Sequence, residues 1–158
     1  MATGAVAGLV GVTPAAGFVT PGAGMAIGAI TSLFCFASVQ VKVRLRFDDS
    51  LDTYAVHGVG CTIGALLTGV FASSELIAGH PASKVLAEQG RGALVLGQLQ
   101  AVLVAYGLAA VGTFLIAFVL RGLGLRFRVT EEAENLGIDV EAHGEAVSYT
   151  HLTLPTKA

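Results

Sequence analysis

One histidine, His57, lies inside an apolar stretch, residues 53–74, that carries no Asp, Glu, Lys or Arg. A neutral imidazole donates one hydrogen bond and accepts another, so it can line a narrow path for a small polar solute without a fixed charge in lipid. An ionisable group in a membrane segment is costly and is by default a candidate for function. Position alone leaves a second interpretation open, in which His57 only hydrogen-bonds to a neighbouring helix as part of the packing. The small size of Gly58, Gly60 and Gly64, which follow it, favours a path beside the ring.

The other reactive side chains do not combine with His57 into a catalytic or metal site. Asp52 lies five residues earlier, and at 100° per residue the two side chains would point about 140° apart on a helix, too far for a base and its orienting partner. Cys35 and Cys61 lack the paired spacing of a disulfide framework or a zinc site and are predicted to be packing residues. The sequence therefore predicts no enzyme, no metal site and no cofactor.

Acidic and hydroxyl side chains precede His57 at the expected start of its helix. Asp48, Asp49, Ser50 and Asp52 can supply N-cap oxygens and negative charge where the helix dipole is positive. We therefore expect Asp52 to cap or tether this helix end. If the helix begins near Asp52, His57 lies roughly 7 to 8 Å into it, inside the hydrocarbon or close to its edge.

Membrane-spanning helices are the elements that must hold these residues. Of the 158 residues, 54% are hydrophobic and 13% charged, against about 25% charged in soluble domains, and the mean hydropathy is +0.75. Because a span needs about 20 apolar residues, the charge-free segments predict spans at 22–41, 53–74 and 92–121, preceded by a partial span at 1–17. Prolines and glycines in "TPAAGFVTPGAG" separate the first two. We predict an all-α polytopic transmembrane helix bundle over residues 1–123.

Basic residues follow the second and the last predicted spans, whereas the loop 73–91 balances its charges. By the positive-inside rule both basic clusters are cytoplasmic, which predicts a multi-pass protein of the cell (inner) membrane with its C-terminus in the cytoplasm. No Lys or Arg precedes Lys42, so the apolar start lacks the basic region of a signal peptide. The net charge of −2 indicates no nucleic-acid partner. The two clusters are Lys42, Arg44 and Arg46, and Arg121, Arg126 and Arg128.

Glycines recur at four-residue spacing along the predicted spans. Small residues at this spacing let helix backbones approach closely in lipid, where dispersion contacts replace the hydrophobic drive. The pattern predicts tight helix packing and says nothing about a transported solute. The pairs are Gly4 and Gly8, Gly24 and Gly28, and Gly60 and Gly64.

Three stretches resemble the ammonium transporters, the Amt/Mep/Rh family. The stretch "DDSLDTYAVHGVGCTIGALLTGVFA" resembles the segment that carries the second of that family's paired pore histidines. The stretch "AGLVGVTPAAGFVTP" resembles its eighth span and the turn after it, and "LRFRVTEEAENLGIDVEAHGE" resembles the cytoplasmic tail of its bacterial members. The three matches follow one another in the same order as in the sequences of that family, over residues 4–145.

The resemblance implies the last four spans of an eleven-helix fold, the first of them truncated, in a homotrimer with a pore through each subunit. It implies that ammonium or ammonia is the substrate, that His57 lines the pore, and that Asp52 is a structural residue near the inner pore end. The partner histidine of the pair and the outer recruitment site would belong to a first half that this segment does not include.

The polar segment 124–146 is predicted to be a cytoplasmic tail in which Thr130 caps a short helix with an acidic first turn. The resemblance implies that this tail is regulatory and takes part in control by PII signalling proteins. Its candidate residues are Thr130, Glu131, Glu132, Gly137, Asp139, His143 and Gly144.

Residues 147–158, "VSYTHLTLPTKA", match no part of the tail and are interpreted as a non-native or misread extension.

An alternative to transport also stays open. Half of an inverted repeat leaves small-residue seams unpaired, so the isolated chain would conduct nothing and would act only as an assembly or PII-binding regulatory module.

Overall fold

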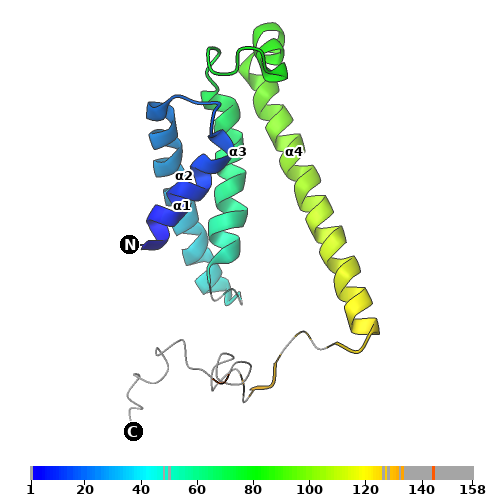
Figure 1. Cartoon of the computed structure of the whole chain (residues 1–158). Helices are drawn as coiled ribbons and strands as arrows, with labels where there is room; N and C mark the ends of the chain where they lie inside the picture. The colour runs from blue at the N-terminus through cyan, green and yellow to red at the C-terminus, as the bar shows by residue number, and fades with distance from the viewer. Residues whose placement is uncertain are drawn as a thin grey trace. The chain divides into compact units, whose positions relative to one another are not determined.

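In a computed structural model the chain is helical, and its first three helices pack against one another (Figure 1). The structure describes residues 2–47, 49, 51–125, 127, 129–131, 133 and 144. This described part contains no strand, which confirms the all-α prediction. The elements are α1 (Ala2–Val12), the 3-10 turn η1 (Thr13–Ala15), α2 (Pro21–Leu45), the π-helical turn η2 (Tyr54–Gly58), α3 (Val59–Phe71) and α4 (Pro81–Gly122).

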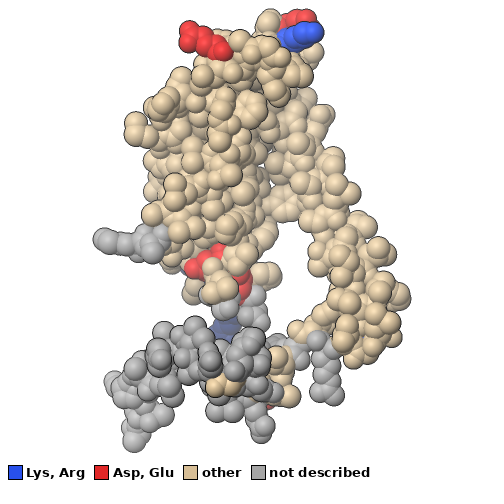
Figure 2. All heavy atoms as spheres, viewed as in Figure 1, with Lys and Arg blue, Asp and Glu red and all other residues tan. Residues whose placement is uncertain are grey.

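Within the described residues, three helical segments are long and apolar enough to cross a membrane: Pro21–Leu45, Tyr54–Phe71 and Pro81–Gly122. A shorter apolar helix covers Thr3–Ala15. On the face drawn in Figure 2, the charged side chains lie near the ends of the described helices, and the middle of each helix is uncharged. The chain is therefore a multi-pass membrane protein.

The connection between α1 and α2 lies where the prolines and glycines predict it. Gly17 has a φ of 82°, a left-handed conformation that glycine adopts without strain. Pro21 is the first residue of α2, where its fixed φ suits the helix. α2 continues four residues beyond the predicted end and includes Lys42 and Arg44 in its last turn. Basic side chains there interact favourably with the helix dipole, so a charged residue does not end the helix.

α4 begins at Pro81, well before the predicted span at 92–121. The expected loop 73–91 thus contains a helical piece over residues 81–89, which the apolar criterion misses because its residues include Lys84 and Glu88. Gly90, with φ 81° and ψ 179°, interrupts the helix just before the predicted start.

The chain divides into two compact units, residues 1–108 and 109–158. The first holds α1, α2, α3 and the first part of α4. The second holds the end of α4, which closes on Gly124 in a left-handed conformation with φ 79°. The Leu125 N–H donates to the Leu120 carbonyl at 3.1 Å and the Gly124 N–H to the Arg121 carbonyl at 3.0 Å, which is the Schellman pattern.

Glycine contacts hold α1, α2 and α3 together. A Cβ on Gly8 would lie 3.3 Å from the Gly28 carbonyl oxygen, and a Cβ on Gly64 would overlap the carbonyl oxygen of Gly11. These close approaches confirm the packing role that the glycine spacing predicts. Gly4 and Gly24 are exceptions, because a Cβ on Gly4 would meet nothing within 4 Å and a Cβ on Gly24 would make only an ordinary contact, 3.4 Å from the Val12 side chain.

Candidate functional site

His57 lies in η2, the π-helical turn that leads into α3. The Val59 N–H donates to the Tyr54 carbonyl, five residues back, which closes a wider ring than the α-helical one. The expectation of 100° per residue through this segment is therefore wrong. Val56 is buried against Ala7 of α1 and Cys35 of α2, whereas His57 is exposed. Such π turns are rare and occur frequently at functional sites.

The sequence predicts that the glycines after His57 leave room for a path beside its ring. In the structure these glycines instead lie against other parts of the chain. A Cβ on Gly60 would lie 3.2 Å from Cys35 Sγ, and Gly64 contacts the backbone of α1. A Cβ on Gly58 would meet the Tyr54 ring at 2.9 Å. These positions serve contacts with α1, with α2 and within the turn itself. Only Gly64 faces a neighbouring backbone, whereas Gly58 and Gly60 face side chains.

Asp49 caps the helical segment that carries His57. The Thr53 N–H donates to Asp49 Oδ1 at 2.9 Å, and the Tyr54 N–H donates to Asp49 Oδ2 at 3.0 Å. Two helix-start donors, which have no partner within the helix, are thereby satisfied by one carboxylate. Asp48 and Ser50, the other expected sources of cap oxygens, lie outside the described residues.

Asp52 has a different role at the same place. Its carboxylate forms an ion pair with Lys42 of α2, whose ammonium group also donates to the Asp49 carbonyl. The Asp52 carbonyl accepts the Val56 N–H at 2.8 Å. Asp52 therefore tethers the end of α2 to the turn that carries His57, and its side chain is not the cap.

Replacing Asp49 with alanine should lower the free energy of unfolding by about 1 kcal/mol, because the two capped N–H groups lose their acceptor. Asp49→Asn should retain part of the stability, because its amide oxygen can accept one of the two N–H groups while its NH2 group cannot accept the other. Denaturant unfolding of the three proteins in detergent measures the difference. Equal losses in the alanine and asparagine variants would show that the charge of Asp49, and not its capping, stabilises this end.

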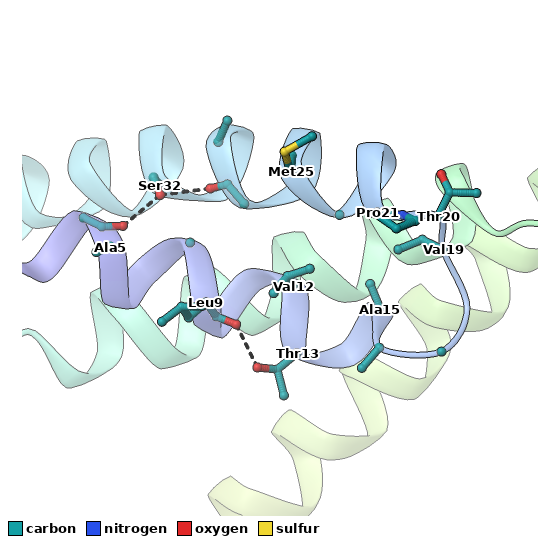
Figure 3. A pocket seen from close by; sticks show the side chains of 17 residues that line it. Ala5, Leu9, Val12, Thr13, Ala15, Val19, Thr20, Pro21, Met25 and Ser32 are labelled. Carbon is teal, nitrogen blue, oxygen red and sulfur yellow. Dashed lines mark hydrogen bonds between the residues drawn. The ribbon is translucent and has the colours of Figure 1, made fainter.

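A groove of about 880 Å³ lies between α1 and α2 (Figure 3). Small or apolar side chains line most of it, and its polar groups are hydroxyls such as those of Thr13 and Ser32. Ser32 already donates to backbone carbonyls, with its Oγ 2.9 Å from the oxygens of both Gly4 and Gly28. Among the described residues, no ionisable side chain lines this groove and His57 is not part of it, so it does not suit a polar solute.

A smaller cavity of about 370 Å³ lies beside η2. Asp52 and Gln40 contribute its most polar side chains, and Cys35 and Val56 form part of its apolar wall. The ion pair with Lys42 already neutralises the Asp52 carboxylate. In the part of the chain that the structure describes, no three His, Cys, Asp or Glu side chains gather as metal ligands.

Two hydroxyl groups contact the carbonyl of Gly58, the residue after His57, and the sequence did not predict them. Thr62 Oγ1 donates to the Gly58 carbonyl at 2.7 Å. The hydroxyl of Tyr106, from α4, lies 2.9 Å from Thr62 Oγ1 and 3.1 Å from the Gly58 oxygen. A threonine four residues after a glycine is common in helices, and nothing in the sequence pairs it with a tyrosine so much later in the chain.

Part of the predicted tail site is described. The Ala133 N–H donates to Thr130 Oγ1 at 3.3 Å, which is the geometry of a helix N-cap. Glu131 is exposed, and Gly144 has a left-handed φ of 67°. Glu132, Gly137, Asp139 and His143 lie outside the described residues.

Comparison with known proteins identifies relatives over nearly the whole chain. The model of the Ammonium Transporter Family matches residues 1–148. An ammonium transporter of Bacillus subtilis (strain 168) is 40% identical over 144 residues, which cover 90% of this chain and 35% of that protein. An ammonium transporter of Aquifex aeolicus (strain VF5) is 40% identical over 146 residues, 92% of this chain and 33% of that protein.

A solved structure has a similar fold. The crystal structure of Saccharomyces cerevisiae Mep2 matches with a TM-score of 0.61 and 32% sequence identity, over 84% of this chain and 32% of that one. The chain thus spans about a third of the length of the proteins that it matches.

Proposed function

This chain belongs to the ammonium transporter family, and we propose that it supplies part of a pathway that conducts ammonium or ammonia across a membrane. The observation that carries the proposal is His57, an exposed imidazole at the start of a membrane-spanning segment that otherwise has no charged side chain. The family membership supplies the substrate class. The chain itself supplies a group suited to that substrate.

An imidazole matches the chemistry of this substrate. Ammonium offers only N–H donors, and ammonia offers donors and one lone pair. A neutral histidine can accept from either species at one ring nitrogen and donate to the ammonia lone pair at the other. An apolar path lined in this way favours the neutral amine, because a bare cation loses its hydration there without a compensating charge. The proton is then relayed separately.

The same proposal includes an orientation and an assembly. α2 and α4 are separated by one membrane-spanning segment, so successive crossings place the ends of both helices on one side. Both ends carry basic side chains, Lys42 and Arg44 in α2 and Arg121 in α4, which favours the cytoplasmic side of the cell membrane. The C-terminal tail then lies in the cytoplasm, within reach of a PII signalling protein.

We propose that the chain assembles as a homotrimer, as its resemblance to the family implies, and its exposed apolar surfaces agree with such an assembly. The most apolar stretch of α4 has 0% of its residues buried within this chain, and Phe114 and Phe118 are 78% and 79% exposed. In a membrane such faces contact lipid or neighbouring helices.

A chimaera tests conduction. Residues 1–148 would replace the matching segment of the Bacillus subtilis ammonium transporter, and methylammonium uptake would be measured in proteoliposomes. We expect uptake above that of empty vesicles, because the segment supplies its share of the path. A chimaera that inserts and folds but conducts nothing would contradict the proposal. If the 158-residue chain alone also gave no flux but co-purified with a PII protein, it would act as an assembly or regulatory module instead.

A further inference from the structure

We propose that Tyr106 and Thr62 are positioning residues for His57, acting through the carbonyl group of Gly58. The inference rests on the proposed role of His57 in conduction and adds the residues that hold its imidazole in place. None of these groups needs to touch the solute.

The contacts between α3 and α4 lie at two levels. At one end of α3, the Arg91 guanidinium donates to the carbonyls of Val70 and Ala72, at 2.8 Å each. Tyr106 lies about 22 Å further along α4, and Gly58 lies about 21 Å from Ala72 along the antiparallel helix. The hydroxyl cluster is therefore the second attachment of α4, at the opposite end of α3 and next to His57.

The distance between the two backbones differs at these levels. A Cβ on Gly69 would lie 3.0 Å from the backbone of Val95, so α3 and α4 are in direct backbone contact there. At the level of Gly58, the full side chain of Tyr106 reaches across, and its terminal oxygen lies 3.1 Å from the carbonyl. The Tyr106 hydroxyl thus joins α4 to the turn that carries His57, whereas near Gly69 the two backbones themselves are in contact.

The Gly58 carbonyl is well placed to control the imidazole, because it belongs to the residue after His57, which is the last residue of the π-helical turn. A threonine that donates to the carbonyl four residues back competes with the helix ladder and bends the helix. Thr62 makes this bond to the Gly58 carbonyl. The Tyr106 hydroxyl lies within hydrogen-bond distance of both Thr62 Oγ1 and the Gly58 oxygen. The three groups satisfy one another's hydrogen-bonding capacity.

Conduction by the chimaera tests the inference. Tyr106→Phe keeps the ring and removes only the hydroxyl. It should reduce methylammonium uptake about threefold, which is the factor that corresponds to the loss of one typical hydrogen bond between membrane helices. Thr62→Val, which keeps the branched shape, should have a similar effect. In a His57→Ala background both substitutions should cause no further loss, because they act through the imidazole. Tyr54→Phe is the matched control: it removes a hydroxyl from the same turn, for which the described part of the structure gives no hydrogen bond, and it should leave uptake unchanged.

The outcomes separate this inference from the proposed function. If His57→Ala lowers uptake but Tyr106→Phe does not, the positioning role is overturned and the pore role stands. If Tyr106→Phe lowers uptake equally with and without His57, the tyrosine only stabilises the fold. If His57→Ala itself changes nothing, the proposed function fails first.

A spectroscopic measurement tests positioning without any conduction. The 158-residue chain is labelled with ¹⁵N-histidine, placed in lipid bilayers and studied by NMR. The imidazole resonance that disappears in the His57→Ala protein belongs to His57. Tyr106→Phe should shift this resonance and leave that of His80 in place. An unchanged His57 resonance in the Tyr106→Phe protein would overturn the inference.

Discussion

Replacing His57 with alanine should reduce methylammonium uptake by the chimaera about tenfold. The change removes a group that accepts and donates hydrogen bonds in a segment with no other charged side chain. A net hydrogen bond is worth about 0.5 to 1.5 kcal/mol, and about 1.4 kcal/mol corresponds to a factor of ten. His57→Gln should give an intermediate rate, because its amide also donates and accepts but with a different shape. The measurement is initial uptake at matched amounts of inserted protein.

The matched control for this prediction is His80→Ala. His80 follows α3 in the chain, and its ring packs edge-on against Phe18 with a centroid distance of 5.4 Å. The same chemical change there should leave uptake unchanged. If His57→Ala also preserved both the rate and the preference for ammonium over methylammonium, His57 would be a packing residue, which is the alternative that its position in the sequence leaves open.

Gly64→Ala should cause the largest loss of stability, about 3 kcal/mol, the upper end of what overpacking a tight interior costs. The added methyl group would overlap the Gly11 carbonyl oxygen and lie 3.0 Å from the Gly11 Cα. Both contacts are backbone atoms, so no side chain can move aside and α1 must separate from α3. The measurement is the fraction of folded protein in detergent as a function of denaturant or temperature.

Gly97→Ala is the control for Gly64→Ala. Gly97 lies in α4, and a Cβ there would meet nothing within 4 Å. Alanine favours a helix over glycine by up to about 1 kcal/mol, so this variant should be as stable as the parent or slightly more stable. Equal losses in both variants would mean that the close contact between Gly64 and Gly11 does not limit stability.

The amino-acid sequence by itself determined the membrane class and the helices. Charge-free runs and hydropathy are properties of neighbouring residues, and the bilayer selects helices of nearly fixed length, so local composition is enough. The break before Pro21 also followed from the sequence, because proline and glycine act on their own backbone. Glycine spacing predicted close helix packing, since residues four apart share one face of a helix. His57 stood out as a candidate because a histidine within a charge-free span is rare in any arrangement.

Tertiary structure alone decided how these parts serve the site. The π-helical turn at His57 gives no periodic signal, because five residues are too few for one. The division of roles between Asp49 as cap and Asp52 as tether depends on Lys42 from another helix. Whether a glycine opens a path or accepts a neighbouring backbone depends on what lies opposite, and Gly60 and Gly64 proved to face α1 and α2. The hydrogen bonds of Tyr106 join residues 44 and 48 positions apart, a separation that only the packing of α4 on α3 brings within reach.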